Sequence, residues 1–74
     1  MDNTVVAIIG YERYNVPLGL LRGSYLQIDG KVREIQTILG EPGSPGYRID
    51  LFAGEEDPPS GEKIYRVENV KSPA

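Results

Sequence analysis

The 74-residue chain contains no cysteine, no histidine and no tryptophan. Without cysteine there is no disulfide, and without cysteine and histidine the usual zinc ligand sets are excluded. The most common general base and the thiolate nucleophile are missing as well, and no serine has an evident activating partner in the sequence. We therefore expect a protein that is not an enzyme and that has no catalytic residue, metal site or cofactor.

Long apolar runs are absent too. No stretch reaches the length of a membrane span, and the first residues lack the regions of a signal peptide. The chain carries eleven acidic and eight basic residues, a net charge of −3. This balance disfavours nucleic acid as the default ligand, because phosphate contacts come mainly from clustered lysine and arginine. We expect a soluble, cytoplasmic protein that does not contact membranes.

The short length predicts one small domain, spanning residues 1–70, with residues 71–74 as a frayed C-terminal tail. Domains of this size bury a small core and are commonly stabilised further by a disulfide, a metal or a partner subunit. Disulfides and zinc are excluded here. A protein partner, including a second copy of the chain, is the remaining source of stability.

The clearest local pattern is a β-hairpin centred on Asp29 and Gly30. A type I′ turn requires positive φ at both central residues, and Asp-Gly adopts this conformation readily. The flanking residues then form two strands, over 25–28 and 31–39. This hairpin fixes a register to which the other strand-like runs of the chain can add.

The segment 31–39 also has a helical alternative. Strict alternation leaves both faces of a strand mixed, so we expect a bulge near Arg33-Glu34, which would turn three residues to one side: Val32, Ile35 and Ile38. Apolar residues also recur here at helical spacing, and Gly40 stands where a C-terminal cap would, so the alternative is an α+β fold with a short helix at 31–39. We favour a strand, because the segment is rich in β-branched residues and directly follows the turn.

Three further runs have strand character, at 4–9, 47–53 and 63–70. We expect residues 11–23 to form a long ordered loop that includes at most one short strand or turn, since Pro17 and several glycines interrupt them. Exposed loops are predicted at 40–46 and at 54–62, where the acidic cluster 55–57 lacks the ordered ligand spacing of a calcium site. Together these patterns predict an all-β protein, a small, five-stranded, partly open barrel.

The tract from Arg22 to Ile35 resembles the strand-and-turn pattern of Tudor, KOW and other SH3-like barrels. The resemblance covers about a fifth of the chain and implies an SH3-like fold. Residues 7–11 are also similar to the opening of a eukaryotic SH3 domain. The chain has no tryptophan and no equivalent of the peptide-binding aromatic pair, so the resemblance transfers no ligand.

Protein binding is the function that these features favour. The run 4–9 is apolar on both faces, so it either crosses the middle of a closed barrel or turns one face to a partner. The five tyrosines exceed what so small a core needs, and tyrosine is enriched in interfaces. We predict a non-catalytic interaction module or accessory protein that binds another protein or itself. The candidate partner-binding residues are Tyr11, Arg13, Tyr14 and Phe52, the last of which belongs either to the core or to the surface.

The alternative function is a small barrel that binds single-stranded nucleic acid or RNA. Such barrels stack bases on aromatic side chains beside lysine and arginine. The candidates for this function are Lys31, Arg33, Arg48, Arg66 and Tyr47. The competing interpretation is that these charges pair with acidic residues on neighbouring strands. A third alternative is a structural subunit of a larger assembly, such as a phage particle.

Overall fold

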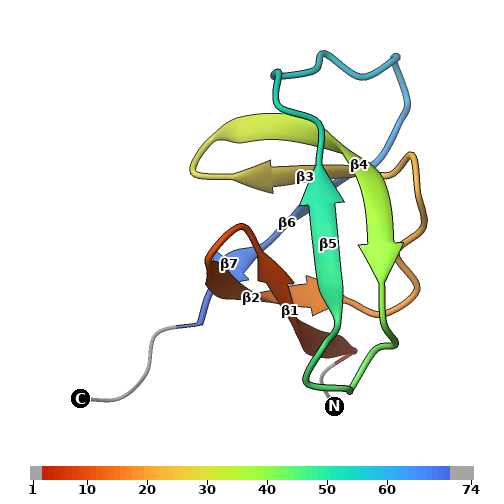
Figure 1. Ribbon diagram of the computed structural model, residues 1–74. Helices are drawn as coiled ribbons and strands as arrows, with labels where there is room; N and C mark the ends of the chain where they lie inside the picture. The colour runs from red at the N-terminus through yellow and green to blue at the C-terminus, as the bar shows by residue number, and fades with distance from the viewer. Residues whose placement is uncertain (1–2, 71–74) are drawn as a thin grey trace.

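The computed structural model describes residues 3–70, which form seven β-strands and no helix (Figure 1). This confirms an all-β fold for the described residues, while the predicted tail at 71–74 lies outside them. The helical alternative is wrong, because 31–39 is a continuous strand that follows a turn with positive φ at Asp29 and Gly30. The strands are β1 (Thr4–Ile9), β2 (Glu12–Pro17), β3 (Tyr25–Ile28), β4 (Lys31–Leu39), β5 (Arg48–Leu51), β6 (Ile64–Arg66) and β7 (Glu68–Asn69).

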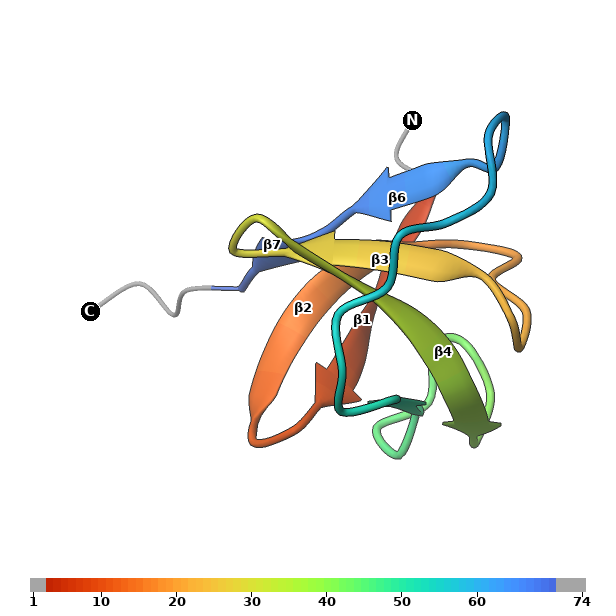
Figure 2. The same ribbon diagram turned by 90° about the horizontal axis from the view of Figure 1, so that it is seen from above.

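The seven strands belong to one sheet that curves into a nearly closed barrel (Figures 1 and 2). Their order is β6-β3-β4-β5-β1-β2-β7, and all neighbours are antiparallel except β1 with β5 and β3 with β6. The last segment of the chain brings the two edges together, because β6 pairs with β3 and β7 pairs with β2. Between them the buried Val67 donates its N–H to the carbonyl of Gln27 at 3.3 Å.

Seven strands replace the five that the sequence predicts, for two reasons. The final strand changes its pairing partner at Val67, and Glu12–Pro17 forms a strand where a loop is expected. In β2, Tyr14 and Val16 alternate inward. Pro17 ends the strand opposite Thr4. This is a non-hydrogen-bonded pair of the antiparallel ladder, so the missing N–H of proline costs no hydrogen bond.

Among residues 3–70, nine buried apolar side chains fill the inside of the barrel. Most of them come from alternate positions of the strands, and Leu20 comes from the β2–β3 connection. Phe52 is 41 % exposed and lies outside this core. The core residues are Ala7, Tyr14, Val16, Leu20, Leu26, Ile35, Tyr47, Ile49 and Val67.

β4 contains a β-bulge, which lies at Gln36. The extra residue reverses the alternation, so that Ile35 and Ile38 both pack in or against the core, as predicted. The predicted position near Arg33-Glu34 is wrong, and Val32 consequently faces away from the core. The reason is that the alternation runs unbroken from the hairpin turn up to Ile35.

Within the described part of the chain, no helix is long and apolar enough to cross a membrane.

Candidate functional site

The outer face of β1 is apolar and uncovered. Alternation along the strand turns Ala7 into the core and leaves Val6 and Ile8 on the outside. Val6 is 42 % exposed although it lies in the middle of a strand. The sequence leaves two interpretations of this strand open, and the structure shows a strand whose outer face no other element of the described chain covers.

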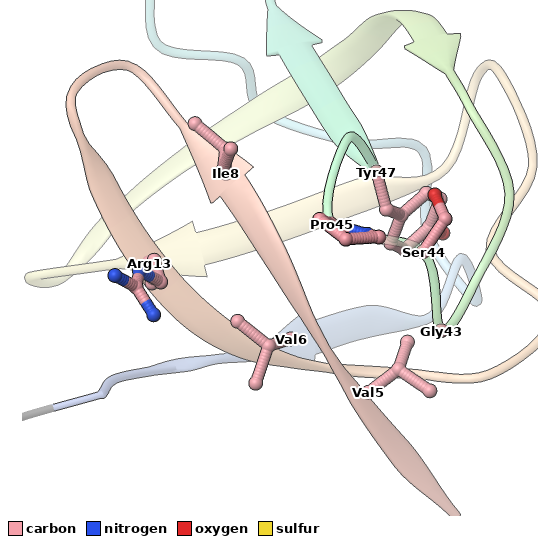
Figure 3. A pocket seen from close by; sticks show the side chains of 8 residues that line it. All are labelled: Val5, Val6, Ile8, Arg13, Gly43, Ser44, Pro45 and Tyr47. Carbon is pink, nitrogen blue, oxygen red and sulfur yellow. The ribbon is translucent and has the colours of Figure 1, made fainter.

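A groove of about 580 Å³ runs along this face, between β1 and the β4–β5 connection (Figure 3). In Figure 3, Pro45, Ser44 and Tyr47 stand on one side, across from Val5 and Val6. Most of the lining is apolar. The lining residues are Val5, Val6, Ile8, Arg13, Gly43, Ser44, Pro45 and Tyr47.

The β4–β5 connection forms the wall opposite β1, and close backbone contacts hold it in place. Gly40 has a φ of +74°, and a Cβ at this position would lie 2.7 Å from the carbonyl oxygen of Gly46. Two turns follow, in which Ser44 N–H donates to the Glu41 carbonyl at 3.0 Å and Tyr47 N–H donates to the Ser44 carbonyl at 3.2 Å. Tyr47, only 2 % exposed, fixes the end of the wall in the core.

One arginine, Arg13, lines the groove, and a second, Arg48, lies on the other side of Ile8 and differs from it in its partners. Arg13 on β2 and Arg48 on β5 both stand beside Ile8 in the register of the sheet. The Arg48 Nε donates to Asp50 Oδ1 at 3.3 Å, and its Nη2 donates to the Gly10 carbonyl at 3.3 Å. Arg13 is exposed and makes no ion pair with any residue in 3–70. Its positive charge is therefore available to a ligand.

The four predicted partner-binding residues do not form a single surface. Tyr11 is fully exposed at the turn between β1 and β2, and Arg13 lines the groove. Tyr14 is 8 % exposed and lies in the core, so its ring is not offered to a partner. Phe52 lies elsewhere, in a shallow depression beside Arg22.

The hydroxyl of Tyr14 is also engaged within the barrel, since it donates a hydrogen bond to Glu12 Oε2 at 3.0 Å. Burial raises the pKa of Tyr14, and the hydrogen bond and negative charge of Glu12 raise it further. Burial likewise raises the pKa of Tyr47. These two tyrosines therefore stabilise the core. The number of tyrosines in the sequence does not tell which of them are buried in this way and which are free to bind a partner.

The five residues of the nucleic-acid alternative are dispersed. Tyr47 is buried, and the guanidinium groups of Arg48 and Arg66 are engaged, the latter through a 3.1 Å hydrogen bond to Gln27 Oε1. Lys31 and Arg33 line a small cavity together with inward-facing residues of other strands. No exposed aromatic platform beside a basic cluster results from this arrangement of the candidates.

The wall of the groove is not predictable from the sequence. Ser44 and Pro45 lie in a segment that the sequence describes only as an exposed loop, and nothing in its composition indicates that it folds toward β1. The sequence feature that does indicate the groove is the run 4–9, which is apolar on both faces of the strand.

Within the described residues, no group of three or more acidic, histidine or cysteine side chains is placed to hold a metal ion. Comparisons with protein-family models, curated proteins and solved structures find no match to this chain. The SH3-like resemblance of residues 22–35 therefore stays a prediction, and the function has to be inferred from the chain's own surface.

Proposed function

We propose that the protein is a non-catalytic interaction module and that it binds a protein partner through the groove between β1 and the β4–β5 connection. The observation that supports this proposal is the exposure of Val6 in the middle of an apolar strand, inside a groove whose opposite wall is also largely apolar. Burying such a surface is favourable by roughly 25 cal/mol for each Å² of apolar area removed from water.

The residues around the groove suit protein recognition. Tyrosine and arginine are enriched at interfaces, where they add large contact area and polar anchoring. Arg13 lines the groove, and the fully exposed Tyr11 lies two residues before it in the sequence. A groove of this size supports a small contact, and interfaces below about 1,200 Å² belong to the weak and transient class. We therefore expect reversible binding.

The lining also supports a non-catalytic role. Among the lining residues in the described chain, Ser44 is the only aliphatic hydroxyl, and none of them is a carboxylate or another general base. A serine without an adjacent base is a poor nucleophile.

The experiment that tests the proposal is capture from a lysate of the native host, followed by binding measurements with the purified partner. Substituting Val6→Glu places a charge in the groove and is expected to weaken binding at least about tenfold. Leu21→Glu is the matched control, because Leu21 is exposed and does not line the groove. Circular dichroism verifies that both variants remain folded.

A third variant, Phe52→Glu, separates the two exposed surfaces. If Phe52→Glu abolishes binding and Val6→Glu does not, the proposed groove is wrong. Binding that falls steeply with added salt would instead indicate phosphate contacts and the nucleic-acid alternative.

A further inference from the structure

Backbone N–H and C=O groups of β1 face the groove. At one end of the β1–β2 hairpin, Leu18 N–H donates to the Asn3 carbonyl at 2.8 Å, and further along, Ile8 N–H donates to the Tyr47 carbonyl at 2.9 Å, on the opposite side of β1. Backbone groups alternate sides along an antiparallel strand. Positions 3, 5, 7 and 9 therefore face β2, while positions 4, 6 and 8 face β5. The N–H and C=O of Val6 point toward the β5 side, where the groove lies.

These groups meet no strand there. β5 begins only at Arg48 and pairs with β1 at a single position, Ile8. Among the backbone hydrogen bonds of residues 3–70 that lie outside the strand ladders, none involves Val6. The first half of β1 is therefore an open strand edge, which is a template for pairing with another chain. The open edge lies along an apolar groove.

We propose that this groove binds an extended peptide segment of the partner, which adds to β1 as a strand over residues 4–6. This inference rests on the proposed function and specifies the partner's chemistry. The added backbone hydrogen-bonds to the N–H and C=O of Val6, and its apolar side chains pack between Val6 and Pro45. The open edge spans three residues, roughly 10 Å of strand, so the recognised core of the peptide is short.

The peptide also carries a carboxylate, which pairs with Arg13. Arg13 lines the groove and has no ionic partner in the described chain, and the lining contains no acidic residue. A second copy of this chain would satisfy the site less well. Its own open edge, residues 4–6, is Thr-Val-Val, which offers apolar side chains but no carboxylate. Strand addition gives affinity through the backbone and specificity through alternate side chains.

The test uses the full chain and a phage library of random seven-residue peptides. Peptides selected on the chain are synthesised and titrated into isotopically labelled protein, with amide hydrogen exchange followed by NMR. The selected peptides are expected to alternate apolar residues and to include Asp or Glu, and they are expected to slow exchange of the Val6 amide at least about tenfold. Arg13→Gln is expected to weaken the acidic peptides about tenfold and their Asn or Gln counterparts less than about threefold.

Two variants separate backbone pairing from side-chain contact. Val6→Pro removes the N–H that the peptide would use, without removing a hydrogen bond to β2, and is expected to weaken binding at least about tenfold. Val6→Thr keeps the N–H and the branched shape and is expected to bind within about threefold of the wild type. If Val6→Pro does not fold, protection of the wild-type Val6 amide decides the question.

The outcomes that overturn the inference are distinct. Peptides that bind in the groove but leave the Val6 amide unprotected contradict strand addition and leave the proposed function intact. Selection of no peptide, or of peptides that perturb only the surroundings of Phe52, contradicts the inference and removes support from the groove itself. Protection of Val6 that appears without peptide as the protein concentration and solution mass rise shows that a second copy occupies the site.

Discussion

The barrel contains two antiparallel hairpins, β1–β2 and β3–β4, whose outer faces differ in their exposure to solvent. On β1–β2 four outward side chains are exposed, Thr4, Val6, Arg13 and Asn15, whereas Ile8 and Pro17 are half-buried. On β3–β4 the outward side chains before the bulge at Gln36 are half-buried (Tyr25, Gln27, Val32 and Glu34), and beyond the bulge Leu39 is exposed. Side chains alternate in both hairpins up to the bulge at Gln36, so alternation alone does not explain the difference in exposure.

The difference comes from the path of the chain after β5. Phe52 N–H donates to the Glu34 carbonyl at 3.0 Å, and Glu56 N–H donates to the Val32 carbonyl at 2.8 Å, so this segment follows β4. It then crosses to β6, which lies beside β3 (Figure 2). No segment of residues 3–70 returns in this way over β1. The chain's own segment therefore lies beside β4 and continues into β6 next to β3, whereas the groove along β1 stays open within residues 3–70.

The two faces also differ in charge. Glu34, Glu56 and Glu62 lie close enough to Tyr25 to raise its pKa, in addition to the effect of burial. The open hairpin instead carries Arg13. The same hairpin also carries Glu12, but Arg13 is its charged residue that lines the groove.

The largest predicted effect concerns the wall of the open groove. Gly40→Ala adds a Cβ 2.7 Å from the Gly46 carbonyl oxygen at a φ of +74°, so it forces the wall to move and lowers the free energy of unfolding by about 3 kcal/mol. Gly43→Ala is the control. Gly43 also has positive φ but has free space around it, so its loss is about 1 kcal/mol. Urea denaturation measures the free energy of unfolding of both variants. Equal losses would contradict the close packing of Gly40 against Gly46.

A smaller effect compares one residue type on the two outer faces. Val32→Ala is expected to cost about 1 kcal/mol, because the Val32 side chain is half-buried. Val6→Ala is expected to stay within about 0.5 kcal/mol, because Val6 is 42 % exposed and lies outside the core. Urea denaturation of the two variants checks this order. A larger loss for Val6→Ala would show that the chain itself uses the face assigned to a partner.

The smallest effect is a dependence of stability on alkaline pH. The pKa values of Tyr14, Tyr25 and Tyr47 are raised above the ordinary 10.0, chiefly by burial. The folded state therefore favours the neutral phenols. Their stabilising contribution is complete below pH 10.0 and is lost as the pH rises through the folded-state pKa values. Urea denaturation at pH 9 and at pH 11 measures this loss. About equal free energies of unfolding at the two pH values would contradict the prediction.

Tyr25→Phe sharpens the pH comparison between the hairpins. Ionised Tyr25 would add a negative charge beside Glu34, Glu56 and Glu62, so the variant is expected to lose less stability between pH 9 and pH 11 than the wild type does. An unchanged loss would show that Tyr25 does not contribute and that the pH dependence arises in the core.

Much of the fold follows from local sequence. The Asp29-Gly30 turn and the alternating runs predict the β3–β4 hairpin and the all-β class, because turn geometry and side-chain period act over a few residues. The strand at 12–17 is not counted among the five predicted strands, because Pro17 and nearby glycines favour a loop with at most one short strand. In the structure Pro17 pairs with Thr4 at a position where no backbone N–H is needed. The division of the last strand at Val67 depends on both barrel edges meeting there, which no local pattern contains.

The candidate site is predictable only in part. The run 4–9 indicates an apolar strand with a second face to cover, and that face is the floor of the groove. Whether a tyrosine is buried depends on tertiary placement, so Tyr11 and Tyr14 look equivalent in sequence although one is fully exposed and the other is in the core. The turns after Gly40 place Pro45 beside the groove. The composition of this segment predicts a loop but does not predict its path.

The most direct measurement is amide hydrogen exchange of the free protein, resolved along β1 by NMR. An open edge predicts alternation, in which the Val6 amide exchanges at least about a hundredfold faster than the amides of Val5 and Ala7, which face β2. Uniform protection of the three amides would contradict the open edge, because it would mean that the chain already covers the strand that we assign to a partner.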